Sequence, residues 1–259
     1  MNLKGKAIPL TQQGFDSATR LLESGAAELW ALLTVETQGC GYLFDRRPVI
    51  LFERHVFHHQ TGGAHDESNP SISNPVPGGY QGGAAEYGRL EEAMGLNEHA
   101  ALNSASWGIG QIMGMNSGIA GFPSVEAMVA AMTDEEDAQL AAIAQCLIRR
   151  RLHTALARHE WEALAKGYNS PNYQENRYDS RLATAYASFS SGALPQIPVR
   201  QAQVLLTFLG FHPGAIDGIP GKQTTNAIAR FRREQGRDPH PTISAPLLAA
   251  LQFSASQLS

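Results

Sequence analysis

Apolar residues recur at helical spacing along most of this chain, and that periodicity constrains the fold more than any other feature. One exception lies at residues 42–52, where two short apolar runs flank a polar turn with Pro48, which predicts a β-hairpin. The first part of the chain is therefore expected to be mainly α, an α+β domain with a small β-hairpin. The helices predicted there span residues 11–24, 26–37, 124–132, 133–151, 153–166 and 173–189.

A second domain is expected after residue 190. With 259 residues, the chain is long enough for one large and one small core. Small residues and two prolines fill residues 187–198, between two stretches of helical periodicity, as is typical of a linker. The predicted division is a domain at 1–190, a linker at 191–197 and a domain at 198–259.

Composition excludes several classes of function. A net charge of −4 gives no basic field for nucleic acid, and no apolar run is long enough to cross a membrane. The two cysteines, Cys40 and Cys146, are too few for a disulfide framework or a cysteine-rich metal site and are expected to be free thiols. We expect a monomer that needs no cofactor, with no nucleic-acid partner and no membrane insertion.

Glu36 interrupts an otherwise apolar helical face. At about 100° per residue, it shares one face of the predicted helix at 26–37 with Leu29, Leu32 and Leu33. Burial raises the pKa of a carboxyl group, so a carboxyl on this face can keep its proton near neutral pH and act as a general acid. The alternative is a glutamate at a helix end that turns to solvent or pairs with an arginine.

Two polar segments have the composition of a sugar-binding surface. Residues 104–114 (Ser-Ala-Ser-Trp-Gly-Ile-Gly-Gln-Ile-Met-Gly) combine glycines, which allow close approach of a ligand, with the amide of Gln111. Residues 168–173 (Tyr-Asn-Ser-Pro-Asn-Tyr) offer aromatic faces and amides, and Trp107 could stack on a sugar ring. A tight helix contact for the first segment and a helix-capping loop for the second remain alternatives.

Histidines suggest a competing hypothesis of a metal site. His55 and His59 have the i, i+4 spacing that can place two ligands on one face of a helix, and His58 and His65 lie nearby. A zinc amidase or peptidase would use such a site. However, no glutamate follows the first histidine as in His-Glu-x-x-His, which disfavours this interpretation.

The order of these features resembles a known superfamily. A glutamate that ends an apolar helix, then Ser-x-x-Gly-x-x-Gln-Ile, then Tyr-Asn is similar to goose-type lysozymes and soluble lytic transglycosylases. More closely, residues 34–37, 50–55, 104–113 and 167–173 resemble the N-acetylmuramidase domain of modular phage endolysins. The resemblance implies that Glu36 is the catalytic acid and that Tyr168 hydrogen-bonds it. The cleft residues that it implies are Gln111, Tyr168, Asn169 and Tyr173.

A second catalytic carboxylate is not singled out by the sequence. Glu53, at the end of the predicted hairpin, is the candidate, and an ion pair with Arg54 or Arg47 is the alternative role for it. Without a base that activates water, the 6-hydroxyl group of muramic acid could attack instead and give an anhydro product. Hydrolase and lytic transglycosylase therefore both remain open. The other carboxylates considered are Asp45, Asp66, Glu67 and Glu86.

The C-terminal part is expected to be a three-helix unit. Its glycine-rich stretch at residues 210–224 strongly resembles the Tyr/Phe-x-x-Gly-x-x-Asp-Gly-x-x-Gly-x-x-Thr motif of the peptidoglycan-binding type 1 domain, and the resemblance covers about residues 198–252. It implies a tether that raises the effective concentration of a catalytic domain at the wall.

Together, the resemblances imply a modular endolysin that binds peptidoglycan glycan strands. It would hydrolyse the β-1,4 bond between N-acetylmuramic acid and N-acetylglucosamine. A wall-binding protein without catalysis is the competing hypothesis. The first nine residues contain two lysines but no apolar core. We therefore expect the enzyme to accumulate in the host cytoplasm and to act on periplasmic peptidoglycan after release.

Overall fold

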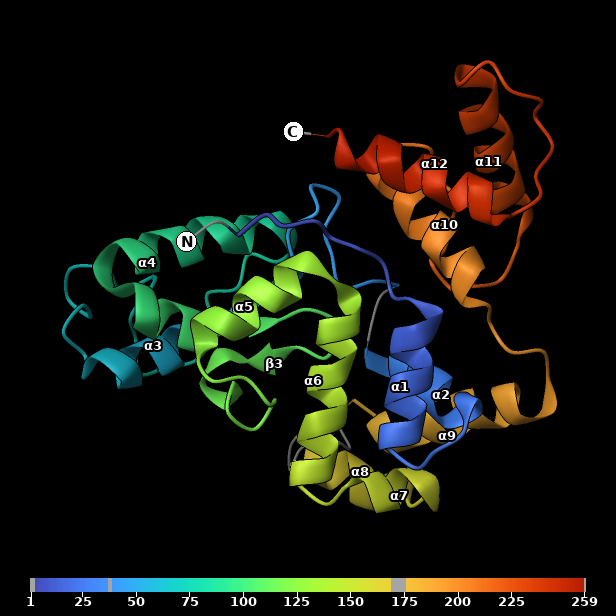
Figure 1. Ribbon diagram of the computed structural model, residues 1–259. Helices are drawn as coiled ribbons and strands as arrows, with labels where there is room; N and C mark the ends of the chain where they lie inside the picture. Colours follow the sequence, from blue (N-terminus) through green and yellow to red (C-terminus); the bar gives the residue numbers. More distant parts are fainter. Residues whose placement is uncertain (1–2, 37–38, 169–175, 259) are drawn as a thin grey trace. The chain divides into compact units, whose positions relative to one another are not determined.

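The computed structural model describes residues 3–36, 39–168 and 176–258. These residues form twelve α-helices and one small three-stranded sheet, which confirms the predicted mainly α fold class (Figure 1). No helix in these ranges is long and apolar enough to cross a membrane. The chain forms two compact units, one of residues 1–7 and 41–146 and the other of residues 8–40 and 147–259. The predicted division near residue 190 stays a prediction.

The sheet of the first unit is antiparallel, in the order β1 (Ile50–Phe52), β2 (Ala105–Trp107), β3 (Ile112–Met113). The partner of β1 is therefore β2, and the hairpin predicted at residues 42–52 is confirmed only around its turn, where the N–H of Leu43 donates to the carbonyl of Arg47 at 2.8 Å. Within that segment, the structure has only an isolated bridge between Tyr42 and Pro48. Pairing with the fully buried β2 places Phe52 and Trp107 in the core, and neither side chain has any exposed surface. Burial of large apolar side chains thus favours a distant partner strand over a local one.

The same part of the chain contains six helical segments. They are α3 (Arg54–Thr61), η1 (Gly83–Ala85), α4 (Glu86–Asn103), η2 (Gly114–Asn116), α5 (Val125–Asp134) and α6 (Glu136–Arg149), whose last residues belong to the second unit. Of these, α4 and η2 contact the sheet directly. The helix α4 was not predicted. Its sequence carries two glycines, and its backbone leaves helical geometry at Asn97, so the helical signal is interrupted.

Glu86 ties the long loop before α4 to the sheet. Its Oε1 accepts hydrogen bonds from the backbone N–H groups of Gln81 (2.5 Å) and Gly82 (2.9 Å). Its Oε2 accepts one from the N–H of Phe52 (3.2 Å) and one from Arg89 (2.9 Å). Burial opposes ionisation of Glu86, but these four donors hold its pKa below the usual value. The loop at residues 62–82 is therefore anchored to the core although it lacks regular structure.

In the second unit, α2 packs along α9, as Figure 1 shows. The helices of this part are α1 (Gln12–Leu21), α2 (Ala26–Glu36), α7 (His153–Ala157), α8 (Trp161–Tyr168) and α9 (Tyr178–Ser191). The single helix predicted at 153–166 is two helices, because His159 adopts positive φ between them. Leu29, Leu32 and Leu33 of α2 are buried, as the predicted apolar face requires.

Three helices form the C-terminal part, as predicted: α10 (Ile197–Phe208), α11 (Lys222–Glu234) and α12 (Ala245–Ser256). The side chain of Gln203 fixes the glycine-rich loop between α10 and α11. It accepts from the N–H groups of Asp217 and Gly218 and donates to Asp217 and to the carbonyl of Ile219. This buried amide thus fixes the loop together with Asp217 and Thr224, which bond Ile219 and Pro213 within it.

Candidate active site

Glu36 is the last residue of α2, and its carboxyl group is partly buried. Tyr178, the first residue of α9, is 4% exposed and donates its hydroxyl hydrogen bond to Oε1 of Glu36. One turn further along α9, Arg181 donates from Nη2 to the carbonyl oxygen of Val35 at 3.0 Å. The packing of α9 on α2 therefore brings a phenol and a guanidinium to the end of the helix that carries the carboxyl group.

The electrostatics at this position favour a protonated carboxyl group. Desolvation raises the pKa of Glu36 from 4.5 to about 8, while the positive charge of Arg181 acts in the opposite direction. A carboxyl group with this pKa holds its proton at neutral pH and can deliver it to a leaving group. The alternative of a solvent-facing glutamate at the helix end does not fit this burial.

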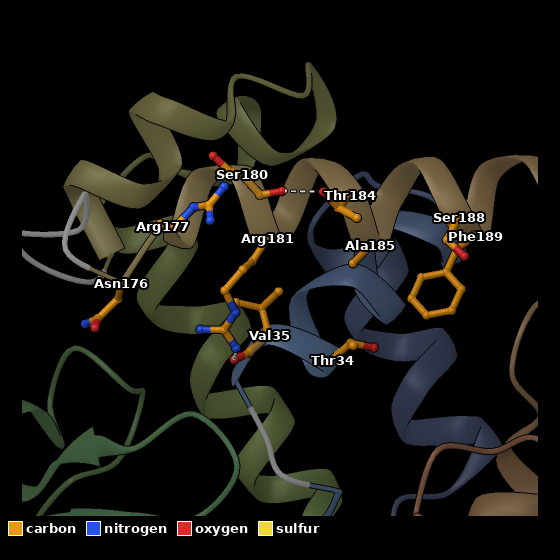
Figure 2. Close-up of a pocket in the computed structure, with 10 residues that line it drawn as sticks. All are labelled: Thr34, Val35, Asn176, Arg177, Ser180, Arg181, Thr184, Ala185, Ser188 and Phe189. Atoms are coloured by element: carbon orange, nitrogen blue, oxygen red, sulfur yellow. Dashed lines mark hydrogen bonds between the residues drawn. The ribbon is translucent and has the colours of Figure 1, made fainter.

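A groove of about 640 Å³ lies in the same unit beside the last turn of α2, although Glu36 itself is not one of its lining residues. It is lined by Thr34 and Val35 of α2 and by side chains from residues 176–189, most of them on α9. Figure 2 shows the side chain of Arg181 reaching from α9 to Val35. Among the lining residues drawn there, Asn176 and Phe189 lie at opposite ends. We call this feature the α9 groove. Its volume lies within the range of small-molecule binding sites.

The tyrosine that contacts Glu36 in the structure, Tyr178, was missed by the sequence analysis. Tyr168, which the resemblance implied for this role, is the last residue of α8, and its bond to Glu36 stays a prediction. Asn169 and Tyr173 lie outside the described residues. A signal for Tyr178 was present, because it lies four residues before the buried Leu182 in a predicted helix and thus on its packed face.

Gln111 directs its amide into the protein. Its Oε1 accepts a hydrogen bond from Ser106 (2.7 Å), and its Nε2 donates to the carbonyls of Gly108 (2.9 Å) and Val49 (3.2 Å). The residue has a positive φ of 45° in the turn that joins β2 to β3. Both N–H groups of this amide are used, one within the turn and one on the carbonyl of Val49 just before β1, so the amide fixes the turn against that strand. Sugar binding by Gln111 stays a prediction.

Glu53 precedes α3 and has 16% of its side chain exposed. Its Oε2 accepts a hydrogen bond from the hydroxyl of Tyr80 at 2.8 Å and lies 3.2 Å from Nδ1 of His55. Burial and the neighbouring carboxylate raise the pKa of Tyr80 to about 12. The predicted alternative of a pair with Arg54 or Arg47 is wrong, because these arginines bond elsewhere, Arg54 to backbone carbonyls and Arg47 to Asp45.

The remaining aromatic and histidine candidates have structural contacts. Trp107 is fully buried and donates to the carbonyl of Leu102, so it cannot stack on a bound sugar as the structure stands. Nδ1 of His58 lies 2.7 Å from Asp66, and His65 stacks on a phenylalanine of α3. Within the described ranges, no three His, Cys, Asp or Glu side chains form a group that could hold a metal ion.

Comparison with known proteins matches both parts of the chain. A family model described as N-acetylmuramidase matches residues 25–190, and one described as a putative peptidoglycan binding domain matches residues 196–239. The crystal structure of the Burkholderia AP3 phage endolysin is similar, with 37% sequence identity and a TM-score of 0.66, over 71% of this chain and 71% of that chain. No curated protein sequence matches the chain. The resemblances predicted from the sequence are confirmed.

Proposed function

Because the chain belongs to the N-acetylmuramidase family, we propose that it is a cell-wall-degrading endolysin whose first part cleaves peptidoglycan. The peptidoglycan-binding match in the C-terminal part and the similarity to a phage endolysin support this proposal. The C-terminal part holds the enzyme on its polymeric substrate. A tether of this kind raises the local concentration of glycan at the catalytic part without adding catalytic contacts.

The bond cleaved in this proposal is the β-1,4 linkage from N-acetylmuramic acid to N-acetylglucosamine, and Glu36 is the general acid. The observation that carries the assignment is the raised pKa of Glu36, about 8, in a carboxyl group that Tyr178 holds by a hydrogen bond. Cleavage requires a proton on the leaving O4 as the bond to the anomeric carbon breaks, and an acid that is still protonated at pH 7 supplies it.

The hydroxyl of Tyr178 fixes the direction of the carboxyl group in this mechanism. A general acid must point its proton at the leaving oxygen, and a buried donor that engages one carboxyl oxygen leaves the other for the substrate. Once the proton has left, Arg181 is the cation that stabilises the new carboxylate, since its charge lowers the pKa of Glu36.

Glu53 remains the candidate for the second carboxylate. Its hydrogen bond from Tyr80 and its proximity to His55 hold an acceptor in a fixed orientation, as a base that activates water needs. If this base operates, water completes the reaction and the enzyme is a hydrolase of the lysozyme type. If it does not, the 6-hydroxyl of muramic acid closes on the anomeric carbon and the product is anhydro-muramic acid.

Mass spectrometry of soluble fragments released from purified peptidoglycan tests the proposal. Wild type should release fragments with reducing muramic acid ends, and Glu36→Gln should release none. Glu160→Gln, at an exposed position of the same unit, is the matched control and should release them as wild type does. Anhydro ends, lighter by one water, would identify a lytic transglycosylase that uses the same acid. Release of free peptides with intact glycan would refute the glycosidase activity. If wild type releases no fragments, the competing hypothesis of a wall-binding protein without catalysis is supported instead.

A further inference from the structure

The α9 groove is lined by positive charge that has no role in the proposed acid catalysis beyond Arg181. Two arginines, Arg177 and Arg181, line it, and none of its lining residues is acidic. Arg181 is engaged with the carbonyl of Val35. Arg177 is exposed, and no described side chain lies within ion-pairing distance of its guanidinium. The groove, which Thr34 and Val35 also line, therefore presents an available positive charge near the end of α2 that carries Glu36.

Hydroxyl groups continue the groove along α9. Ser180, Thr184 and Ser188 recur every four residues and so share one side of the helix. Figure 2 shows this row between Arg177 and the ring of Phe189. Twelve residues separate these two ends, which corresponds to about 18 Å of helix. Thr184 donates its hydroxyl hydrogen to the carbonyl of Ser180, and Ser180 donates its own to Asp179, so these hydroxyls face a ligand mainly as acceptors. The groove thus offers a cation, a row of hydroxyl oxygens and an apolar end, in that order.

The substrate contains one part with matching chemistry. The sugar rings of a peptidoglycan strand are neutral, and the lactyl group of muramic acid is an amide wherever a peptide is attached. The peptide stem carries free carboxylates, and a stem of five residues spans about 17 Å when extended. The stem also begins on the sugar ring whose glycosidic bond is cleaved, so it starts next to the general acid.

We propose that the α9 groove binds the anionic peptide stem on the muramic acid at the scissile bond, with Arg177 pairing with a stem carboxylate. This inference rests on the proposed function, because it needs a glycan strand seated at Glu36. It makes Arg177 a specificity residue, since a guanidinium forms charge-assisted hydrogen bonds with a carboxylate that a neutral amide cannot replace. The enzyme should accordingly prefer strands with ionised stems.

Matched substrates test the preference directly. Soluble peptide-bearing strands with acetylated amines are compared with the same strands after conversion of their carboxylates to primary amides. The measured quantity is the ratio of kcat/KM on the two substrates. Wild type should prefer the carboxylate strands by roughly fivefold to tenfold, the size expected for one exposed charge-assisted contact. In Arg177→Gln, the ratio should fall at least about threefold, and Arg177→Lys should retain most of it.

Arg158→Gln is the control, because it removes the same charge from an exposed position of the same unit outside the groove. It should keep the wild-type ratio, which separates pairing in the groove from general attraction to an anionic polymer. Equal ratios for wild type and Arg177→Gln, with both substrates cleaved, would overturn the stem-binding role and leave the proposed function intact. If wild type cleaves neither strand, the proposed function fails and this inference fails with it.

Discussion

Replacement of Glu36 by glutamine should stabilise the protein, and the gain should grow with pH. Glutamine keeps an oxygen that can accept the hydrogen bond of Tyr178, but it cannot ionise. In the unfolded chain, the carboxyl group ionises near pH 4.5, whereas in the folded chain it holds its proton until about pH 8. Stability therefore falls between these two values as pH rises, and the full loss is present above pH 8.

The size of the loss follows from the two pKa values of Glu36. The interval from 4.5 to about 8 corresponds to about 5 kcal/mol of unfolding free energy above pH 8, at about 1.4 kcal/mol per pH unit. At pH 7, about 3 kcal/mol of this has been lost. For a chain of this size, 1 kcal/mol moves Tm by about 2–4 °C, so the gain from Glu36→Gln at pH 9 should be on the order of 10 °C.

Differential scanning calorimetry at pH 5, 7 and 9 measures the effect on the transition that contains Glu36. Glu160→Gln, which removes a carboxyl group at an exposed position, corrects for changes in net charge. A Tm difference between Glu36→Gln and wild type that is the same at all three pH values would refute the reasoning. So would a variant that is less stable than wild type at pH 9, because the carboxylate would then be stabilised in the folded state.

Three further predictions concern the site and its supports. The kcat/KM on peptidoglycan should fall above about pH 8 as Glu36 loses its proton. Because the charge of Arg181 lowers the pKa of Glu36, Arg181→Gln should move this fall to higher pH. A fall at the same pH in the variant would contradict the role of Arg181. Glu86→Gln should lower the unfolding free energy by about 3 kcal/mol in urea denaturation, because it leaves a buried arginine uncompensated, whereas the exposed Glu91→Gln should change little. Gln111→Ala should lower the stability by about 2 kcal/mol in the same assay, and a raised KM at unchanged stability would instead support direct sugar contact.

Local periodicity was sufficient to predict the helix that carries the acid. Leu29, Leu32 and Leu33 repeat at helical spacing, and the structure buries all three on α2. The number of C-terminal helices was also predictable, and α11 in particular has an apolar stripe, with Ala227, Ile228 and Phe231 buried. In these cases, the information lies within a dozen consecutive residues, which is the range over which helical hydrogen bonds and amphipathic faces act.

Features that depend on distant partners were not predictable in the same way. The sequence shows that Ile50 and Phe52 suit a strand, but their partner lies more than 50 residues away, and only burial of the whole sheet selects it. The amide of Gln111 has the chemistry of a ligand contact, yet Ser106, Gly108 and Val49 take up its hydrogen bonds inside the protein. The helical pattern places Tyr178 on the packed face of α9, but it does not encode that this face packs on α2 and so brings Tyr178 to Glu36.

The position of Glu36 as the final residue of α2 has a consequence for turnover. The C-terminal end of a helix carries a partial negative charge from carbonyls without intrahelical partners, so a second negative charge there is unfavourable. Arg181 neutralises part of this field, because it bonds the carbonyl of Val35 in the last turn. In the proposed mechanism, the field at this helix end would favour reprotonation of the carboxylate after each proton donation. The backbone of α2 would thus help to restore the protonated form of Glu36 before the next glycosidic bond is cleaved.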